Sequence, residues 1–293
     1  MVTAGIIALT VALPIVLRTR PILPTASREQ LRSMSKDAVK ETFSHQGWRL
    51  TAAFANKCEA CISPSNHLAR ILVDEGGLTA PCYVRPNGIN TSLYRDAAPQ
   101  DSPVEKRPGE RFIISVARLS PEKRQKALIE AMPHIPDNRI KLVLVGGGPY
   151  ENELRMRAAE LGVTGRVIFT GMQPSDKVAS LLKQADVFSL ASYHFDNQPM
   201  TFLEAASSGL PIVYCDEQMT EGLTERNSVL ADGIEGEDLA RAFNGLFSDP
   251  ERLERLSLGS LDVARDFDST TMAERMVGLY ESLIRDHRAL PYR

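Results

Sequence analysis

The feature that most constrains the fold of this 293-residue chain is an alternation of short apolar runs with amphipathic segments. From about Arg111 onward, a strand-forming run and a turn precede a helical stretch several times in succession. The strand-forming runs are RFIISVA, IKLVLV, RVIFTG and DVFSLA. Unbroken apolar runs of this length are typical of parallel strands that are covered by helices on both faces. The pattern predicts a doubly wound α/β domain.

Other segments flank this repeating pattern. Upstream, EACISPS predicts a strand that leads into the helix NHLARILVDEGG, and CYVRPNGIN predicts a strand that ends in a turn at Asn87 and Gly88. Residues 95–110 are rich in proline and charge and lack an apolar period, which predicts an interdomain linker. The last helices are expected over 235–247, 250–265 and 269–286.

Composition excludes several classes of function. A formal net charge of -3 leaves no basic excess for a nucleic-acid backbone, so nucleic acid is not an expected partner. Four scattered cysteines are too few for a secreted disulfide framework, which favours a reducing, cytoplasmic location. Cys58 and Cys61 form a C-x-x-C pair, but no second pair accompanies it, so a structural role is preferred to a redox or metal site.

The N-terminal stretch MVTAGIIALTVALPIVLRTR raises the question of a signal peptide or a membrane anchor. It lacks a basic start, Pro14 interrupts it, and its apolar run is shorter than the roughly 20 residues that a spanning helix needs. We therefore expect a helix followed by a buried strand PIVL. Peripheral contact with a membrane is the alternative.

Ligands of open parallel sheets bind beyond the carboxyl ends of the strands, so the loops after the predicted strands are the candidate site. Arg118 and Lys123 follow RFIISVA and flank a helix that is expected to begin at Pro121. Two cations beside a helix N-terminus suit a pair of phosphates. The alternative is that both residues are solvated surface charges.

Two further loops offer backbone groups. Gly146, Gly147 and Gly148 follow KLVLV, and their missing side chains would let a ligand approach the backbone closely. The run lacks the G-x-G-x-x-G spacing of a dinucleotide site. The loop TGMQPSD could present the backbone near Met172 to a flat base, although on its own it indicates only a turn.

The stretch HFDNQPMTFLEAASSGLPIV carries two carboxylates in contrasting settings. Asp196 lies among loop formers, whereas Glu204 lies in an apolar run, where a charge is costly unless a partner or a ligand compensates it. Pro199 is expected at the first helical position, which leaves the N–H groups of Met200 and Thr201 free to face the site. A salt bridge between Glu204 and a lysine is the alternative.

Six stretches occur in a recognisable order: CISPSNHLARIL, VRPNGINTSLY, SVARLSPEKRQKALIEA, LVLVGGGPYENELRMRAAELGVTGRVIFTG, ADVFSLAS and DNQPMTFLEAASSGLPIV. The last four resemble the donor half of retaining glycosyltransferases of family four, and the first two resemble the segment that precedes it. The resemblance runs from about Ala55 to Leu283. It implies a GT-B-like α/β fold, with a doubly wound donor domain and a shortened N-terminal α/β piece.

The resemblance also implies an order of domains. Residues 1–107 would be a partial, acceptor-side domain, 108–268 the donor-binding domain, and 269–293 a helix that crosses back to the N-terminal piece. Complete members have a further N-terminal segment with a glycine-rich loop, so the chain is expected to be N-terminally truncated. Where relatives often carry a histidine beside the donor sugar, this sequence has Arg18-Thr19-Arg20.

In that family, two acidic residues separated by seven others handle the nucleotide sugar. Carried over, Glu204 holds the ribose hydroxyls and Asp196 contacts the transferred sugar, while Arg118 and Lys123 neutralise the diphosphate. Arg118, Lys123 and Asp196 are thus the expected catalytic residues, and electrostatic catalysis of this kind requires neither a metal nor another cofactor. Glu204, Met200, Thr201, Gly147 and Met172 are the expected donor-binding residues. Asp196 replaces a commoner glutamate, and Pro199 stands where glycine is frequent.

The implied activity is a retaining hexosyltransferase that uses a nucleoside-diphosphate sugar, with UDP as the expected nucleotide and a glycan, lipid or small molecule as acceptor. A non-catalytic nucleotide-sugar-binding remnant and a sugar-nucleotide epimerase are the alternatives. Asp266-Phe267-Asp268 spells the D-x-D of metal-dependent GT-A enzymes, but it lies among C-terminal helices, so no metal is expected there. His194 is expected to be an exposed loop residue rather than a catalytic base.

Overall fold

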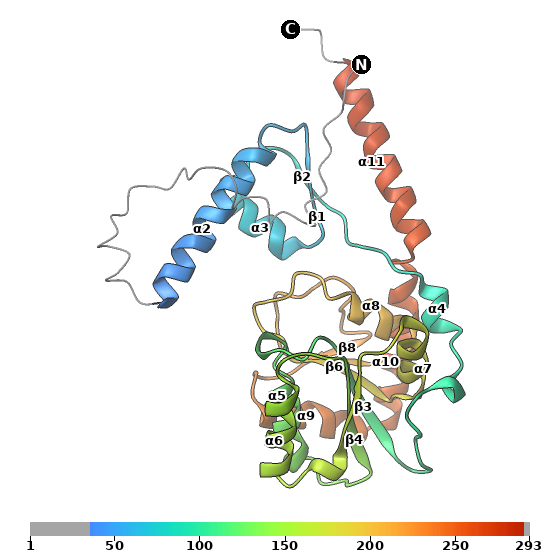
Figure 1. Cartoon of the computed structure of the whole chain (residues 1–293). Helices are drawn as coiled ribbons and strands as arrows, with labels where there is room; N and C mark the ends of the chain where they lie inside the picture. The colour runs from blue at the N-terminus through green and yellow to red at the C-terminus, as the bar shows by residue number, and fades with distance from the viewer. Residues whose placement is uncertain (1–35, 290–293) are drawn as a thin grey trace. The chain divides into compact units, whose positions relative to one another are not determined.

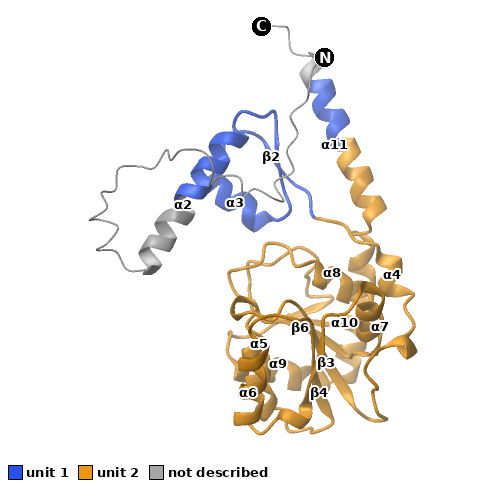
Figure 2. Ribbon diagram, in the orientation of Figure 1, with its two compact units in different colours: residues 1–86, 279–293 blue, residues 87–278 orange. Residues whose placement is uncertain are grey.

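The computed structural model describes residues 36–289, and side chains between residues 46 and 286. The expected N-terminal helix and strand, the membrane contact and Arg18-Thr19-Arg20 lie outside the described residues. Of the described helices, none combines the length and the apolar character needed to cross a membrane. The chain divides into two compact units, one of which spans Asn87–Gly278, while the other takes the residues up to Pro86 and from Leu279 onward (Figure 2).

The larger unit is built on a six-stranded parallel sheet with the order β5-β4-β3-β6-β7-β8 (Figure 1). Its strands are β3 (Arg111–Val116), β4 (Ile140–Val145), β5 (Val167–Gly171), β6 (Val187–Leu190), β7 (Ile212–Tyr214) and β8 (Ser228–Leu230). This sheet confirms the doubly wound architecture. The sequence pattern predicted neither β7 nor β8, because each has only three residues, and in β8 only Ser228 is buried.

Helices cover both faces of this sheet, because successive residues of each strand are buried on opposite sides. Ile113 on β3 packs on the face that α5, α6 and α9 cover, whereas its neighbours Phe112 and Ile114 pack on the face of α4, α7 and α8. Burying each such side chain contributes about 1.5–3 kcal/mol. The helices are α4 (Thr91–Arg95), α5 (Gln125–Ala131), α6 (Glu151–Glu160), α7 (Ser175–Gln184), α8 (Met200–Ser207), α9 (Gly236–Phe247), α10 (Pro250–Arg265) and α11 (Ser269–Ala289).

The segment 95–110, expected to be an interdomain linker, lies within the larger unit and is anchored there. The Lys106 ammonium lies 2.6 Å from an Asp186 carboxylate oxygen and donates to the Gln184 carbonyl at 2.9 Å. The same Asp186 oxygen accepts the Phe112 N–H at 2.6 Å. The first boundary between the two units therefore falls between Pro86 and Asn87, and the second falls between Gly278 and Leu279. The assignment of the units to acceptor and donor stays a prediction.

The first residues of the larger unit lie beside the segment that leads into its last helix, α11. The Ile89 N–H donates to the Phe267 carbonyl at 2.9 Å, and the Ser269 N–H donates back to the Ile89 carbonyl at 2.8 Å. The Thr91 hydroxyl donates to Asp268 at 2.6 Å. The chain is therefore extended here, instead of forming the turn that was expected at 87–88.

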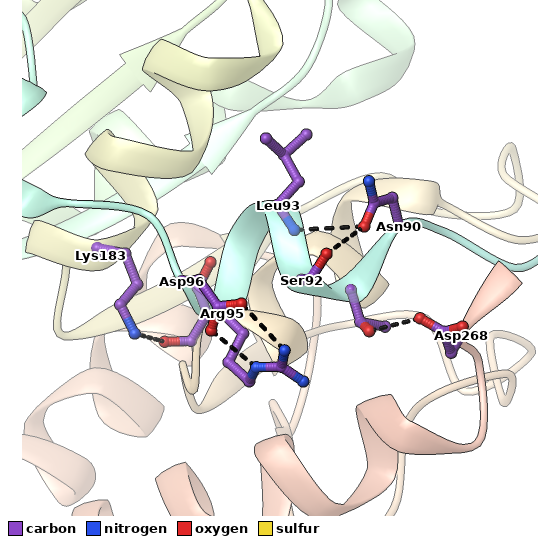
Figure 3. Close-up of polar contacts among 9 residues, drawn as sticks. Asn90, Ser92, Leu93, Arg95, Asp96, Lys183 and Asp268 are labelled. Carbon is purple, nitrogen blue, oxygen red and sulfur yellow. Dashed lines mark hydrogen bonds and ion pairs between the residues drawn. The ribbon is translucent and has the colours of Figure 1, made fainter. Parts of the chain in front are cut away.

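Asp268 of the D-x-D sequence has a structural role at this junction. It lies next to α4, whose first turn is capped by the Asn90 side chain (Figure 3). The Thr91 hydroxyl and the backbone N–H of Thr270 donate to its carboxylate, and these bonds lower its pKa below the ordinary value. Asp266 instead faces Arg275, at 3.3 Å.

The smaller unit pairs two short parallel strands with two helices. Its elements are α2 (Lys36–Ala55), β1 (Cys61–Ser63), α3 (Asn66–Asp74) and β2 (Cys82–Val84). The Ser65 side chain caps α3, and Leu68 and Leu72 of that helix enter the core of the unit. Cys61 lies opposite Cys82 in the strand register, and burial raises the pKa of the Cys61 thiol to about 11. A thiol held protonated in this way is a poor nucleophile.

Candidate functional site

The candidate site follows from the order of the strands in the sheet. The chain proceeds from β3 outward to β4 and β5, and then returns to place β6 on the other side of β3. The loops after β3 and β6 therefore leave the sheet toward opposite faces, and in open sheets the ligand crevice is expected between two such loops. Every residue that sequence analysis selected for the site follows one of the strands β3, β4, β5 and β6.

Backbone hydrogen bonds tie the loops after β3, β4 and β5 together. The Leu119 N–H donates to the Gly147 carbonyl at 3.1 Å, and the Tyr150 N–H donates to the Leu119 carbonyl at 3.2 Å. The Gly146 N–H donates to the Gly171 carbonyl at 2.9 Å. These bonds bring Gly147 close to the exposed residue that follows β5, which is Met172.

The three glycines after β4 serve different purposes. A Cβ atom on Gly146 would lie 2.0 Å from the Ala117 carbonyl oxygen, and one on Gly148 would lie 2.1 Å from the Leu119 carbonyl oxygen. These two glycines let the loops pack against each other. Gly147 is open, since its nearest neighbour would be the Met172 nitrogen at 3.9 Å. A close approach of a ligand to the backbone is therefore a prediction for Gly147 alone.

The two predicted cations lie on a loop rather than at the start of an α-helix. Residues Pro121–Lys123 form a single 3-10 turn, Arg124 is left-handed with φ 52, and α5 begins only at Gln125. The expected helix at Pro121 was therefore wrong, because Arg124 interrupts it and donates to the Ile234 carbonyl at 2.7 Å. Arg118 is exposed, and among the described residues its guanidinium makes no hydrogen bond.

Lys123 and Asp196 meet across the crevice. The Lys123 ammonium lies 2.5 Å from one Asp196 carboxylate oxygen, and the Ser192 hydroxyl donates to the other at 2.6 Å. The lysine and aspartate side chains are 18% and 14% exposed, so much of their water is excluded. The Phe195 ring also lies 5.2 Å from the ammonium. Residues from the loops after β3 and β6 thus form one ion pair.

Anchors on both sides of Asp196 hold its loop. The buried Asp216 carboxylate accepts the His194 N–H at 2.7 Å, and the exposed His194 ring stacks on Tyr193 at 3.9 Å. On the other side, the Gln198 side chain accepts the Asn87 N–H at 2.7 Å and the Asn87 side-chain amide at 2.9 Å. Asp196 is therefore presented by a fixed segment.

The helix after this loop begins one residue later than expected. Pro199 is its N-cap and not its first residue, and α8 starts at Met200. The first intrahelical bond runs from the Phe202 N–H to the Pro199 carbonyl at 3.1 Å. The N–H groups of Met200 and Thr201 have no acceptor among the described residues, as a helix start leaves them.

Glu204 lies in the first turns of α8, and its partner is a tyrosine and not a lysine. Burial raises the pKa of the Glu204 carboxyl, and a hydrogen bond from the Tyr94 hydroxyl partly offsets that effect. Burial and the nearby Glu204 charge in turn raise the pKa of Tyr94, so its hydroxyl stays a donor. The sequence pattern did not single out Tyr94, although a tyrosine that is buried needs a partner for its hydroxyl.

Metal ligands do not gather in the described part of the chain. No group of three or more His, Cys, Asp or Glu side chains there could hold a metal ion. The charges near Asp196 and Glu204 are met instead by Lys123 and by the Tyr94 hydroxyl.

Solved structures share this fold. The Anabaena protein HepE, determined in complex with UDP and glucose, aligns with a TM-score of 0.74 and 24% identity over 83% of this chain and 69% of that one. The sucrose-phosphate synthase of Thermosynechococcus elongatus aligns with a TM-score of 0.73 and 20% identity over 88% of this chain and 65% of that one. The architecture is that of GT-B glycosyltransferases.

The chain belongs to the family described as glycosyl transferases group 1, whose sequence profile matches residues 97–259, more than half of the chain. The alpha-monoglucosyldiacylglycerol synthase of Streptococcus pneumoniae is 28% identical over 236 residues, which cover 78% of this chain and 50% of that protein. A GDP-mannose-dependent phosphatidylinositol monomannoside mannosyltransferase of Mycolicibacterium smegmatis is 26% identical over 265 residues, or 80% of this chain and 67% of that protein. The chain thus spans half the length of the former relative.

The glycine loop generates a first prediction. Gly148→Ala should destabilise the fold by about 1–3 kcal/mol, because the new methyl group would overlap the Leu119 carbonyl. Gly147→Ala is the matched control and should change stability by less than about 0.5 kcal/mol. Urea unfolding of both variants measures the difference. Equal losses would contradict the separate roles of these glycines.

Tyr94 generates a second prediction. Because burial raises the pKa of Glu204, its ionisation lowers stability as pH rises from the unfolded-state pKa through the folded-state pKa. Tyr94→Phe removes the bond that offsets this cost, so its destabilisation, about 1–3 kcal/mol above about pH 7, should shrink below about pH 4.

Urea unfolding at both pH values measures this effect. Tyr214→Phe is the control, because Tyr214 hydrogen-bonds to the neutral Ser228. The free energy of unfolding that Tyr214→Phe loses should therefore not vary with pH in this way. If the stability lost in Tyr94→Phe does not depend on pH, the bond between Tyr94 and Glu204 is not the source of the destabilisation.

Proposed function

We propose that this chain transfers a hexose from a nucleoside-diphosphate sugar, with UDP as the nucleotide, to a glycan, lipid or small-molecule acceptor, with retention of configuration. The observation that carries the proposal is the meeting of Lys123 and Asp196 across the crevice between β3 and β6, beside the exposed Arg118. A cation pair at this edge suits a diphosphate, and a carboxylate beside it suits sugar hydroxyls.

Arg118 and Lys123 act on the leaving group. As the bond from the sugar to the diphosphate breaks, negative charge accumulates on the terminal phosphate oxygens. Cations already placed at that point stabilise the charge without reorganisation, which is the largest contribution that such a site can make. This role calls on the side chains of Arg118 and Lys123 and on no bound metal.

Glu204 holds the ribose. An ionised carboxylate offers about four lone-pair positions, so Glu204 can accept from the Tyr94 hydroxyl and from two ribose hydroxyls at once. The free N–H groups of Met200 and Thr201 lie one turn before it on the same helix and would serve the phosphate or the sugar. The open Gly147 and the backbone at Met172, whose side chain is 85% exposed, would face the base.

Support for the choice of donor and acceptor comes from relatives. HepE was determined with UDP, and the Mycolicibacterium mannosyltransferase depends on GDP-mannose, so both nucleotides enter the experiments below. The Streptococcus synthase forms a glucosylated diacylglycerol by its name, which favours lipid acceptors in an acceptor panel. Action in the cytoplasm, with the acceptor at a membrane surface, is part of the proposal.

Two alternatives make different products. A chain that binds the nucleotide sugar without transfer would release no nucleoside diphosphate with any acceptor, and an epimerase would interconvert the donor sugar. Release of UDP that depends on an added acceptor supports transfer over both.

Arg118 provides the third prediction. Arg118→Ala should weaken UDP or GDP binding at least about tenfold, because a charge-assisted contact to the diphosphate contributes about 1.5–3 kcal/mol. Isothermal titration calorimetry measures it. Arg139→Ala is the control, since Arg139 is an exposed arginine that precedes β4 at the opposite edge of the sheet and pairs with Asp137. Unchanged affinity in Arg118→Ala would exclude this loop as the diphosphate site.

Glu204 provides the fourth prediction. Glu204→Gln keeps an oxygen that can accept from Tyr94 but loses the negative charge to which the ribose hydroxyls would donate. The binding of UDP and of UDP-glucose should therefore both weaken by about 1–3 kcal/mol. Pyrophosphate, which has no ribose, should bind the variant as it binds the unaltered protein. Calorimetry with the three ligands, accompanied by thermal melts, tests this. An equal loss with pyrophosphate would show that Glu204 acts on the diphosphate or on the fold and not on the ribose.

A further inference from the structure

The ion pair at the crevice raises a difficulty for donor binding, and this inference rests on the proposed function. If Lys123 is to meet a diphosphate, it must do so from a position where a carboxylate already holds it at 2.5 Å. The pair is mostly shielded from water, and the second oxygen of Asp196 is engaged by Ser192. Donor binding therefore changes an existing interaction instead of filling an unpaired cation.

We propose that Asp196 is the counter-ion of Lys123 in the donor-free protein, and that the diphosphate of the donor displaces it. Asp196 then turns from the lysine to the hydroxyls of the transferred sugar. The lysine exchanges the carboxylate for the diphosphate, and Asp196 exchanges the lysine for sugar hydroxyls. Neither the ammonium nor the carboxylate is then left buried without a partner, which would be strongly unfavourable.

The neighbourhood of the pair supports an exchange by side chains alone. The loop is fixed on one side by the bond from the His194 N–H to Asp216, and on the other by the bonds between Gln198 and Asn87. Asp196 thus stays within reach of the crevice when it releases Lys123. Arg118 is exposed and forms no ion pair with the described residues, although the Glu122 charge lies near it, so it is the residue that a diphosphate would meet first.

A consequence concerns the product. A complete donor brings both a diphosphate for Lys123 and sugar hydroxyls for Asp196, whereas the nucleoside diphosphate that remains after transfer brings only the diphosphate. Asp196 is then left beside the phosphates as an unpaired like charge, and it recovers Lys123 as the product leaves. Asp196 therefore weakens the binding of the product more than the binding of the substrate.

The direct test removes the charge of Asp196 and measures binding of ligands without a sugar. Asp196→Asn should bind pyrophosphate and UDP at least about threefold more tightly than the unaltered protein, since a competing carboxylate is gone and Lys123 lacks its counter-ion. The gain should shrink at high salt, which screens charges. Asp137→Asn, the same change in the exposed pair with Arg139, should leave the affinity unaltered.

A double variant separates exchange from simple repulsion. In a Lys123→Met background, Asp196→Asn should bring a clearly smaller gain in pyrophosphate affinity, because the cation for which the two anions compete is absent and only the repulsion between like charges is relieved. An equal gain in that background would overturn the exchange and leave only repulsion between Asp196 and the phosphates. Unaltered or weaker binding of pyrophosphate by folded Asp196→Asn would overturn it as well.

Stability offers an independent readout. Lys123 without its counter-ion should lower the melting temperature of Asp196→Asn, and pyrophosphate should raise that temperature by more than it does in the unaltered protein. If Asp196→Asn does not fold, Ser192→Ala is the second variant. Ser192→Ala keeps every charge but removes the hydroxyl that holds Asp196. Its pyrophosphate affinity should therefore rise, although by less than that expected for Asp196→Asn. An unchanged affinity would count against the proposal.

The outcomes also distinguish this inference from the proposed function. If UDP binding weakens in Arg118→Ala but does not tighten in Asp196→Asn, the donor site is supported and the exchange of partners by Asp196 is excluded. No binding of UDP, GDP or pyrophosphate by either the unaltered protein or Asp196→Asn would remove both.

Discussion

The pairing of β6 with β3 is the constraint on which the site depends. The two strands are joined through Ile113 with Val187 and Ile114 with Phe188, and this pairing places β6 on the side of β3 away from β4. Helices that follow the two strands must cover opposite faces of the sheet, because each face carries its own apolar residues. The loops above β3 and β6 separate for that reason, and the charges that they carry face each other across the gap.

The carboxylate of Glu204 shows how such a fold carries charge within apolar surroundings. Phe202, Leu203, Ala205 and Ala206 on the same helix are fully buried, and burial alone would favour the protonated form of Glu204. Tyr94, from a helix of five residues more than a hundred positions earlier in the chain, supplies a donor. The helix α4 packs on the same side of the sheet as α8, so the apolar contacts that hold α4 also keep the hydroxyl aimed at the carboxylate.

Much of this fold could be predicted from apolar runs, but the partners of the charges could not. The strands β3, β4 and β6 are buried along most of their length and appear in the sequence as unbroken apolar stretches. The strands β7 and β8 have three residues each and leave no such signal. The roles assigned to Arg118, Lys123 and Asp196 stay predictions, and the structure places these charges after β3 and β6. Their pairing depends on which strand lies beside β3, and that order is set by packing between distant residues. Arg124 escaped prediction because a side chain rarely adopts the left-handed conformation.

The junction between Ile89 and Asp268 has a consequence for the history of such chains. Ile89 and Asp268 form a parallel bridge, so the segment 89–268 begins and ends at neighbouring positions that bond to each other. A segment whose ends meet can be grafted into another protein with little disturbance of the host, because the host must connect to only one place. Residues 89–268 therefore have the geometry of a segment that can be transferred as one piece, together with the carboxyl edge of its sheet.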